Sequence, residues 1–405
     1  MNKGTMFAVA LAILAQDAVA ANTDWNNFQG DASHTGFAAV HSDPAKIYPL
    51  WTHNVFLADK ASEESSFKHI FGGIAVKDDV AYISLYGYKF NSKNTIVSIV
   101  MAFNTTTGKT IWRKVLDNAI KVSAPVLASG KVIVSIDKDD SSSIIALQPS
   151  SGDIDYELPQ DEYKPFAPQV FGDDLYFRSS SNNSLNASTG KINWTSANTT
   201  SANFIPALTE DYIMLPMHHG LEALDRKTGR AAFTIDAPGS FSDELKPIYP
   251  VYNRKDNAVY VLLATNDDAN SNYSLYAMDL KTHQIKWQSK DHYTQPILAD
   301  NEIFELNYSD GLISKLNAID PATGKVTWSW ADTNVFNMLT NDPIIATKDL
   351  VFAASGTGLL GISRTTHVPV WKSKKFTNHL AIADNKLFSI YFQDGDAAIS
   401  VYALS

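Results

Sequence analysis

The chain has 405 residues, 45% hydrophobic and 19% charged, so it can bury a large core and is not a disordered polypeptide. Its 33 lysines and arginines are outnumbered by 43 aspartates and glutamates, and the net charge of −10 argues against nucleic acid as a partner. The absence of cysteine excludes disulfide frameworks, thiolate metal sites, cysteine nucleophiles and a lipid-modified N-terminal cysteine.

Residues 1–20 have the pattern of a secretory signal peptide. Lys3 supplies positive charge, Phe7 to Leu14 form a short apolar run, and Ala18-Val19-Ala20 offers small residues to a signal peptidase. The apolar run is far shorter than the roughly 20 residues that a membrane span needs. We therefore expect cleavage after Ala20 and one mature domain over residues 21–405, periplasmic or secreted, with no transmembrane segment.

One short motif recurs along the chain, as in Ala102 to Trp112 and Ala318 to Trp328. In each copy an aromatic residue stands four positions after a glycine, or after His283 or His367 in two copies. The aromatic residues of the seven copies are Trp112, Tyr156, Trp194, Phe233, Trp287, Trp328 and Trp371. Glycine at that position permits the left-handed backbone of a tight turn, and the aromatic residue then enters the next strand.

A second repeated signal precedes each motif. Apolar stretches that often begin at proline are followed by turn pairs such as Asp300-Asn301 and then by short β-type runs. These stretches begin at Gly73, Pro125, Pro168, Pro206, Pro250, Pro296, Pro343 and Leu380. A spacing of about 40 to 50 residues with four short strands per unit is typical of a β-propeller blade, and eight units are present.

The chain ends account for the eighth blade. Residues 399–404 read as a third strand that stops before its turn, and Pro49-Leu50-Trp51 reads as an outermost strand without predecessors. Pairing the two closes the ring and removes exposed strand edges. The sequence thus predicts an all-β fold, a single eight-bladed propeller with four-stranded antiparallel blades closed by its N- and C-terminal strands.

The motif resembles the blade signature of the quinoprotein, or PQQ-like, β-propeller superfamily. The opening segment Trp25 to Gly36 is also similar to one that begins many compact members. In style the chain is closest to the non-enzymatic propeller subunit of the outer-membrane β-barrel assembly machinery. The resemblance implies that the motif aromatics pack between blades as structural residues: Trp51, Trp112, Tyr156, Trp194, Phe233, Trp287, Trp328 and Trp371.

Catalytic chemistry is hard to find in this sequence. The vicinal cysteines of the quinone alcohol dehydrogenases are absent, and no convergent Glu, Asn and Asp set for a calcium-bound quinone can be placed. His218 and His219 are adjacent on a strand and point to opposite faces, and the Asn266 to Asn272 loop lacks the glycine and glutamate of a calcium loop. We expect no catalytic, cofactor or metal residues, and PQQ with calcium only under the enzymatic alternative.

The sequence favours a non-catalytic function without deciding whether the protein is an enzyme. We expect an exported scaffold for protein–protein interaction in outer-membrane or envelope assembly, a monomer whose partner is another envelope or extracellular protein. A PQQ-dependent oxidoreductase and a carbohydrate- or small-ligand-binding propeller remain the alternatives.

Propeller geometry also predicts where a partner or ligand would be met. Residues just before each innermost strand line one mouth of the central channel, and aromatic and mixed polar groups there suit recognition. These residues are Lys164, Phe166, Phe204, Tyr249, His292, Tyr293, Asp342 and His379. The alternative is that the aromatic members cap the core between blades.

Overall fold

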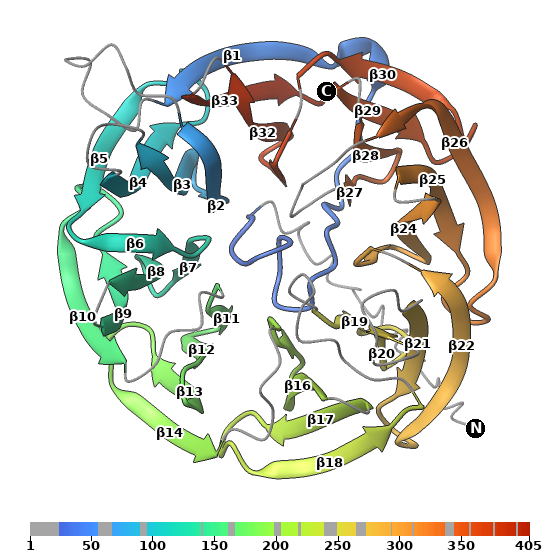
Figure 1. Cartoon of the computed structure of the whole chain (residues 1–405), viewed down its shortest axis with the longest axis horizontal. Helices are drawn as coiled ribbons and strands as arrows, with labels where there is room; N and C mark the ends of the chain where they lie inside the picture. Colours follow the sequence, from blue (N-terminus) through green and yellow to red (C-terminus); the bar gives the residue numbers. More distant parts are fainter. Residues whose placement is uncertain are drawn as a thin grey trace, which may run out of the picture.

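Short strands joined by tight turns form eight sheets around a central channel in the computed structural model (Figure 1). The structure describes residues 24–55, 67–89, 95–138, 141–160, 167–197, 204–217, 220–238, 249–264, 273–292, 294–309, 312–336, 344–355, 358–375, 377–393 and 396–405. Within each sheet the strands run antiparallel, from the innermost strand at the channel to the outermost strand at the rim. This arrangement confirms the predicted eight-bladed β-propeller.

The blades follow one another in chain order. The first four consist of β2 (Phe67–Lys77), β3 (Val80–Lys89), β4 (Thr95–Asn104) and β5 (Thr110–Leu116); β6 (Ala119–Val122), β7 (Val126–Ala128), β8 (Lys131–Lys138), β9 (Ser141–Leu147) and β10 (Ile154–Gln160); β11 (Gln169–Phe171), β12 (Asp174–Arg178), β13 (Ser181–Asn186) and β14 (Ile192–Ala197); and β15 (Ala207–Leu208), β16 (Tyr212–Met217), β17 (Gly220–Asp225) and β18 (Ala231–Asp236).

The remaining four blades complete the ring. They consist of β19 (Val251–Asn253), β20 (Ala258–Ala264), β21 (Tyr273–Asp279) and β22 (Gln284–His292); β23 (Ile297–Ala299), β24 (Glu302–Ser309), β25 (Leu312–Ile319) and β26 (Val326–Phe336); β27 (Ile344–Ala346), β28 (Leu350–Ser355), β29 (Gly358–Ser363) and β30 (Pro369–Ser373); and β31 (His379–Ala383), β32 (Lys386–Gln393), β33 (Asp396–Ala403) and β1 (Tyr48–Val55), with the 3-10 turn η1 (Pro44–Lys46) before β1.

Blade 8 joins the two ends of the chain. Strand β1 pairs antiparallel with β33, from Tyr48 opposite Ala403 to Val55 opposite Ala397. The expected closure is therefore confirmed, and the pairing is longer than the two short segments that predicted it. Ile399, Val401 and Leu404 are fully buried in this blade, so the C-terminus contributes core as well as hydrogen bonds.

Blade 2 departs from the common pattern at its innermost strand. Strands β6 and β7 both pair with β8, and the break between them lies at Ser123 to Pro125. Proline lacks the N–H that would continue the ladder. The Ser123 hydroxyl instead accepts a hydrogen bond from the backbone N–H of Ser135 at 2.9 Å, so the chain bends without leaving that amide unpaired.

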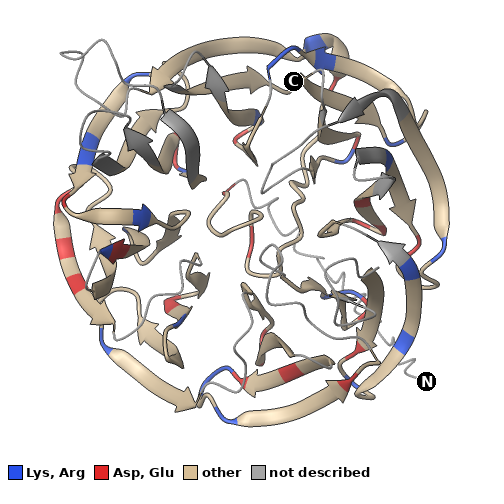
Figure 2. Cartoon of the chain, in the orientation of Figure 1, with Lys and Arg blue, Asp and Glu red and all other residues tan. Residues whose placement is uncertain are grey.

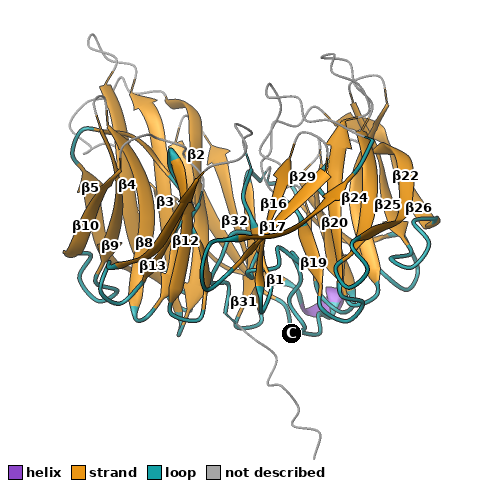
Figure 3. Cartoon of the chain, turned by 90° about the horizontal axis from the view of Figure 1, so that it is seen from below, coloured by secondary structure: helices purple, strands orange, loops and turns teal. Residues whose placement is uncertain are grey.

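The hydrophobic core lies between neighbouring blades. Each blade presents two apolar faces, and separate clusters of buried side chains fill the spaces between adjacent sheets. The described turns gather along one edge of the ring (Figure 3). Lysines and arginines are interspersed with aspartates and glutamates around the ring (Figure 2). No helix in the described part of the chain is long and apolar enough to cross a membrane.

Ring closure predicts a strong effect of C-terminal truncation. Deleting residues 399–405 removes the burial of Ile399, Val401 and Leu404, each worth about 1.5–3 kcal/mol. It also takes most of β33 from between β1 and β32, so β1 loses most of its pairing and β32 keeps only β31 as a neighbour. This loss approaches the whole stability of a typical protein, roughly 5–15 kcal/mol, so we expect aggregation and proteolysis near Trp51. Deleting the exposed Ser405 alone is the control. A truncated protein that stays monomeric with an unchanged Tm would contradict the closure.

Candidate functional site

The N-terminal segment of the described chain, residues 24–43, crosses the central channel (blue coil in Figure 1). An innermost strand of a propeller has one unpaired edge facing the channel, and buried backbone N–H groups must find partners. The segment supplies these partners to seven blades in succession. Six of these N–H groups donate to backbone oxygens of the segment at 2.7–3.0 Å: Val76 to Trp25, Leu127 to Asn26, Leu208 to Ala32, Tyr252 to Ser33, Leu298 to Thr35 and Ala346 to Gly36. The seventh, the N–H of Val170, donates to the side-chain oxygen of Asn27 at 2.7 Å.

The same segment reaches the eighth blade at its far end. The Asp43 N–H donates to the backbone oxygen of Leu404 at 3.1 Å. Gly36 has a φ of +62°, and a Cβ built there would lie 2.6 Å from the Ile297 side chain, so this close approach requires glycine. We call residues 24–43 the channel segment.

His34 lies at the centre of the channel segment and is fully buried. Its Nδ1 lies 3.0 Å from the Pro250 backbone oxygen and its Nε2 lies 3.0 Å from Oε1 of Gln169. The imidazole also makes edge-to-face contacts with Phe28 and Tyr249, at centroid distances of 5.8 and 5.4 Å. One side chain thus ties the segment to blades 3 and 5.

Burial lowers the pKa of His34 to about 4, although its hydrogen bonds to Gln169 and Pro250 act in the opposite direction. Both ring nitrogens face oxygen atoms, which favours the charged ring, but the loss of hydration is the larger effect. Burial also raises the pKa of Asp31, against hydrogen bonds from Thr35, Ser33 and His34. His34 is therefore neutral at pH 7.

The structure places three of the predicted mouth residues in the interior. Phe204 is 1% exposed, and the Arg178 guanidinium lies 4.6 Å from the centre of its ring. Tyr249 is 2% exposed, and its hydroxyl accepts a hydrogen bond from Gln29 of the channel segment. His379 begins β31 and is 3% exposed.

The side chains of the other five predicted mouth residues are not described. The backbone of His292 ends β22, and nothing is described of its side chain. Lys164, Phe166, Tyr293 and Asp342 lie outside the described residues, as do His218, His219 and the loop from Asn266 to Asn272. An open mouth lined by all eight residues therefore remains a prediction.

The motif aromatics form a relay around the rim, each packing on the turn of the next blade. Trp51 of blade 8 lies over Gly108 of blade 1, and Trp112 of blade 1 lies over Gly152 of blade 2. The indole N–H of Trp51 donates to the backbone oxygen of Thr105 at 2.8 Å, and that of Trp112 to Pro149 at 2.7 Å. The same packing continues with Tyr156 on Gly190, Trp194 on Gly229 and Trp287 on Gly324.

The two histidine exceptions fit the same relay. His283 and His367 have φ of 56° and 61°, the left-handed backbone that glycine takes elsewhere. Their imidazoles stack on Phe233 at 3.8 Å and on Trp328 at 4.3 Å between ring centroids. Stacking offsets part of the backbone cost. At the last interface, Trp371 of blade 7 instead meets Tyr402 of blade 8 edge-to-face, at 5.2 Å between ring centroids.

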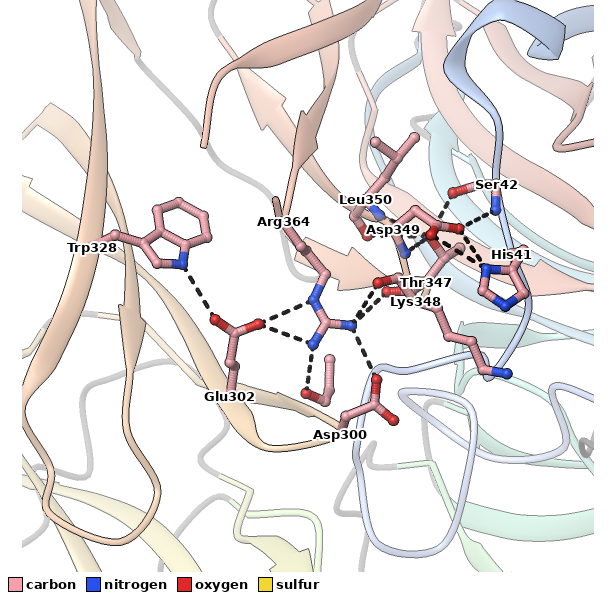
Figure 4. A network of polar contacts seen from close by, with 11 residues as sticks. His41, Ser42, Asp300, Glu302, Trp328, Thr347, Lys348, Asp349, Leu350 and Arg364 are labelled. Atoms are coloured by element: carbon pink, nitrogen blue, oxygen red, sulfur yellow. Dashed lines mark hydrogen bonds and ion pairs between the residues drawn. The ribbon is translucent and has the colours of Figure 1, made fainter. Parts of the chain in front are cut away.

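Arginines at one position of the motif clamp two of the blade interfaces. Arg364 of blade 7 reaches Glu302 of blade 6 at 2.9 Å and Asp300 at 3.2 Å, while its Nη1 donates to the backbone oxygen of Thr347 at 2.9 Å (Figure 4). Glu302 also accepts a hydrogen bond from the Trp328 indole N–H at 3.2 Å. In a second cluster, the Asp349 carboxylate lies 3.1 Å from Nδ1 of His41 and accepts a hydrogen bond from the backbone N–H of Ser42, both in the channel segment. Arg226 of blade 4 is the counterpart of Arg364.

The described residues do not fit a calcium-bound quinone. No three His, Cys, Asp or Glu side chains converge within the described ranges in a way that could hold a metal ion. The channel segment also occupies the inner strand edges at its end of the channel.

Comparison with protein families finds a match over almost the whole described chain. The family model described as outer membrane protein assembly factor BamB matches residues 48–184 and 179–405. No curated protein matches the sequence.

Among solved structures, the chain is similar to BamB from Moraxella catarrhalis, with 15% identity, a TM-score of 0.61, and coverage of 88% of this chain and 99% of that one. It is also similar to the quinohemoprotein alcohol dehydrogenase ADHIIG from Pseudomonas putida HK5, with 10% identity, a TM-score of 0.52, and coverage of 94% and 80%. The computationally designed Ika8 protein gives 13% identity, a TM-score of 0.58, and coverage of 84% and 97%. At these identities the similarity shows the shared fold.

The aromatic relay predicts different effects of two matched glycine substitutions. Gly108 and Gly130 both have a φ of +69°, so alanine costs each about 1–2 kcal/mol of backbone strain. A Cβ at Gly108 would also lie 2.6 Å from the Trp51 ring, whereas one at Gly130 would meet nothing within 4 Å. We expect Gly108→Ala to lose about 1–3 kcal/mol more than Gly130→Ala in chemical denaturation. Equal losses would show that the contact with Trp51 contributes nothing.

The buried His34 predicts lower stability in mild acid. The unfolded chain takes up a proton at His34 below its ordinary pKa of 6.5, whereas the folded chain does so only near pH 4, so this contribution falls across that window. At pH 5 the loss relative to pH 7 is about 2 kcal/mol. His34→Gln, which cannot titrate, should lack this component in unfolding measured at both pH values. Identical pH dependence in the variant and the unsubstituted protein would refute the assignment.

Proposed function

Because the chain belongs to the family of outer membrane protein assembly factor BamB, we propose that it is an exported, non-catalytic scaffold that binds another envelope protein during outer-membrane assembly. The observation that carries the proposal is the channel segment, which pairs with the innermost strands of seven blades. A ligand at that end of the channel would compete for the same backbone groups. Recognition is therefore left to the turns and rims of the blades, which suits a protein partner.

The proposal includes the location of the protein. Residues 1–20 are a signal peptide, and the mature chain begins at Ala21, three residues before the first described residue, Asp24. The protein then lies in the periplasm or outside the cell, where its partner is exposed to it. We propose that it acts there as a monomer.

The fold shared with a quinohemoprotein alcohol dehydrogenase supports one alternative, a PQQ-dependent oxidoreductase. Such an enzyme needs acidic side chains to hold calcium beside the quinone, and the described residues bring no such group together. A scaffold needs only defined surfaces. The turns supply these, since their backbones are fixed by the aromatic relay and by the clamps of Arg226 and Arg364.

Purification of the native protein from the envelope of its own cells tests the proposal. We expect a chain that begins at Ala21 and one envelope protein that copurifies in a fixed ratio, even after dilution. Adding PQQ and calcium to the purified protein should give no dye-linked oxidation of alcohols or sugars. A chain that keeps Met1, or quinone-dependent oxidation at enzymatic rates, would overturn the proposed function.

A further inference from the structure

A groove of about 360 Å³ lies where blades 1 and 2 meet the channel segment. Its walls come from the hairpin turns of blades 1, 2 and 3, from the motif turn of blade 2 and from the channel segment itself. The side chains that matter for its chemistry are Asn26, Lys77, Asp78, Tyr82, Lys131 and Pro149. A space of this size, part polar and part apolar, falls in the range of binding sites for small groups.

The repeats of the propeller show what is unusual at this groove. Tyr82 of blade 1, Tyr176 of blade 3 and Tyr260 of blade 5 stand at the same position of the second strand. The Tyr176 hydroxyl accepts a hydrogen bond from Nη1 of Arg226 at 3.1 Å, and the Tyr260 hydroxyl accepts one from Asn253 at 3.1 Å. The Tyr82 hydroxyl has no such partner among the described residues, although the side chain is 6% exposed.

One position of the motif bears on the missing partner. Arg226 and Arg364 directly follow the aspartate or serine that opens the motif turn, whereas proline occupies this position in blade 2 (Pro149) and in blade 6 (Pro321). Between blades 3 and 4, the Arg226 guanidinium lies 3.4 Å from Asp174, 3.1 Å from the Tyr176 hydroxyl and 4.2 Å from the centre of the Phe171 ring. Proline cannot reach across, and beside Pro321 the Tyr260 hydroxyl is instead satisfied by Asn253. Next to Pro149 the described residues place neither an arginine nor such an asparagine at the Tyr82 hydroxyl, and the space between blades 1 and 2 stays open.

The charges around the groove favour a cation. Lys77 is paired with Asp24 at 2.7 Å and Lys131 with Asp155 at 2.5 Å, so both lysines are neutralised. Asp78 lies near Lys77, and no described residue forms a salt bridge with it. The charged residues that line the groove are Lys77, Lys131 and Asp78, and Asp24 and Asp155 lie outside the lining as the partners of the two lysines. With each lysine charge balanced by its partner, Asp78 carries the remaining negative charge.

Uncharged acceptors complete the lining. The Asn26 side-chain oxygen is shielded from water and has no hydrogen-bond partner in the described structure. Burial, together with the nearby Asp78 charge, raises the pKa of Tyr82 to about 12, so its hydroxyl stays neutral and can accept a hydrogen bond. Carboxylate, amide and phenol oxygens match the donors of a guanidinium group.

We propose that this groove receives an arginine side chain from a loop of the partner protein, which takes the place that Arg226 takes between blades 3 and 4. The inference rests on the proposed function, since it names the residue type by which the partner is recognised. The guanidinium donates to the Tyr82 hydroxyl and pairs with Asp78. Its stem packs against Leu127 and Pro149 at the groove wall.

The probe for a direct test is the peptide acetyl-Gly-Arg-Gly-amide, titrated into the full mature chain and followed by NMR at the Tyr82 ring. The matched peptide carries citrulline, which keeps the shape of arginine but lacks its charge. We expect the arginine peptide to bind about tenfold more tightly than the citrulline peptide. Equal affinities, or shifts that do not include Tyr82, would overturn the proposal.

Variants of the full chain sharpen the test. Tyr82→Phe should weaken the arginine peptide about tenfold with little change in Tm, because its hydroxyl has no partner within the described protein. Tyr176→Phe, at the same position of a blade whose arginine is already present, should leave peptide affinity unchanged. Pro149→Arg should fill the groove from within and abolish peptide binding. If Pro149→Arg does not fold, the Tyr82→Phe result alone decides.

Copurification with the same variants separates this proposal from the function on which it rests. A partner that is retained by the unsubstituted protein and lost with Tyr82→Phe and Pro149→Arg, but kept with Tyr176→Phe, supports both. A partner that binds all four proteins equally leaves the scaffold function standing and overturns the arginine site. The absence of any partner, with the peptide preference intact, overturns the scaffold function alone.

Discussion

The unpaired inner edge of each blade is the constraint on which the rest of this structure depends. An edge strand at the centre of a ring is shielded from water, so its N–H groups need partners that the blade cannot supply. The channel segment meets this need for seven blades, with hydrogen bonds between 2.7 and 3.0 Å. At about 1 kcal/mol each, seven such bonds are comparable with the net stability of a whole protein.

Closure at the centre and closure at the rim are complementary. The channel segment connects blades through backbone groups, whereas the aromatic relay connects each outermost strand to the next turn through side chains. Both follow the order of the blades along the chain. At the groove, the hydroxyl of Tyr82 lacks, among the described residues, the hydrogen-bond partner that the hydroxyls of Tyr176 and Tyr260 have at the same position of their blades. Such a difference between otherwise equivalent blades is informative about recognition.

The sequence was sufficient to predict the blades because their signals are local. The turn glycine, the aromatic four residues later and the hairpin pairs each depend on the backbone of a few neighbouring residues, and the structure confirms eight blades closed by β1 and β33.

The path of the channel segment could not be predicted this way. Its contacts join distant parts of the chain, as Asn27 pairs with Val170, 143 residues away. Most of these contacts also use backbone atoms, which carry no sequence signal. Of the eight residues predicted at the mouth, Phe204, Tyr249 and His379 are buried, and the side chains of the other five lie outside the described part of the chain, so a mouth for recognition stays a prediction. The groove was not predicted, because proline at the position of Arg226 and Arg364 also occurs in blade 6 and does not by itself mark an open space.

Hydrogen exchange of the backbone amides at the inner strand edges tests this account most directly. The account predicts that the amides of Val76, Leu127, Val170, Leu208, Tyr252, Leu298 and Ala346 exchange as slowly as the amides within central strands such as β8, since both open only when the ring opens. If these seven amides exchange within seconds while β8 stays protected, the channel segment does not hold the blades together, and the central claim is wrong.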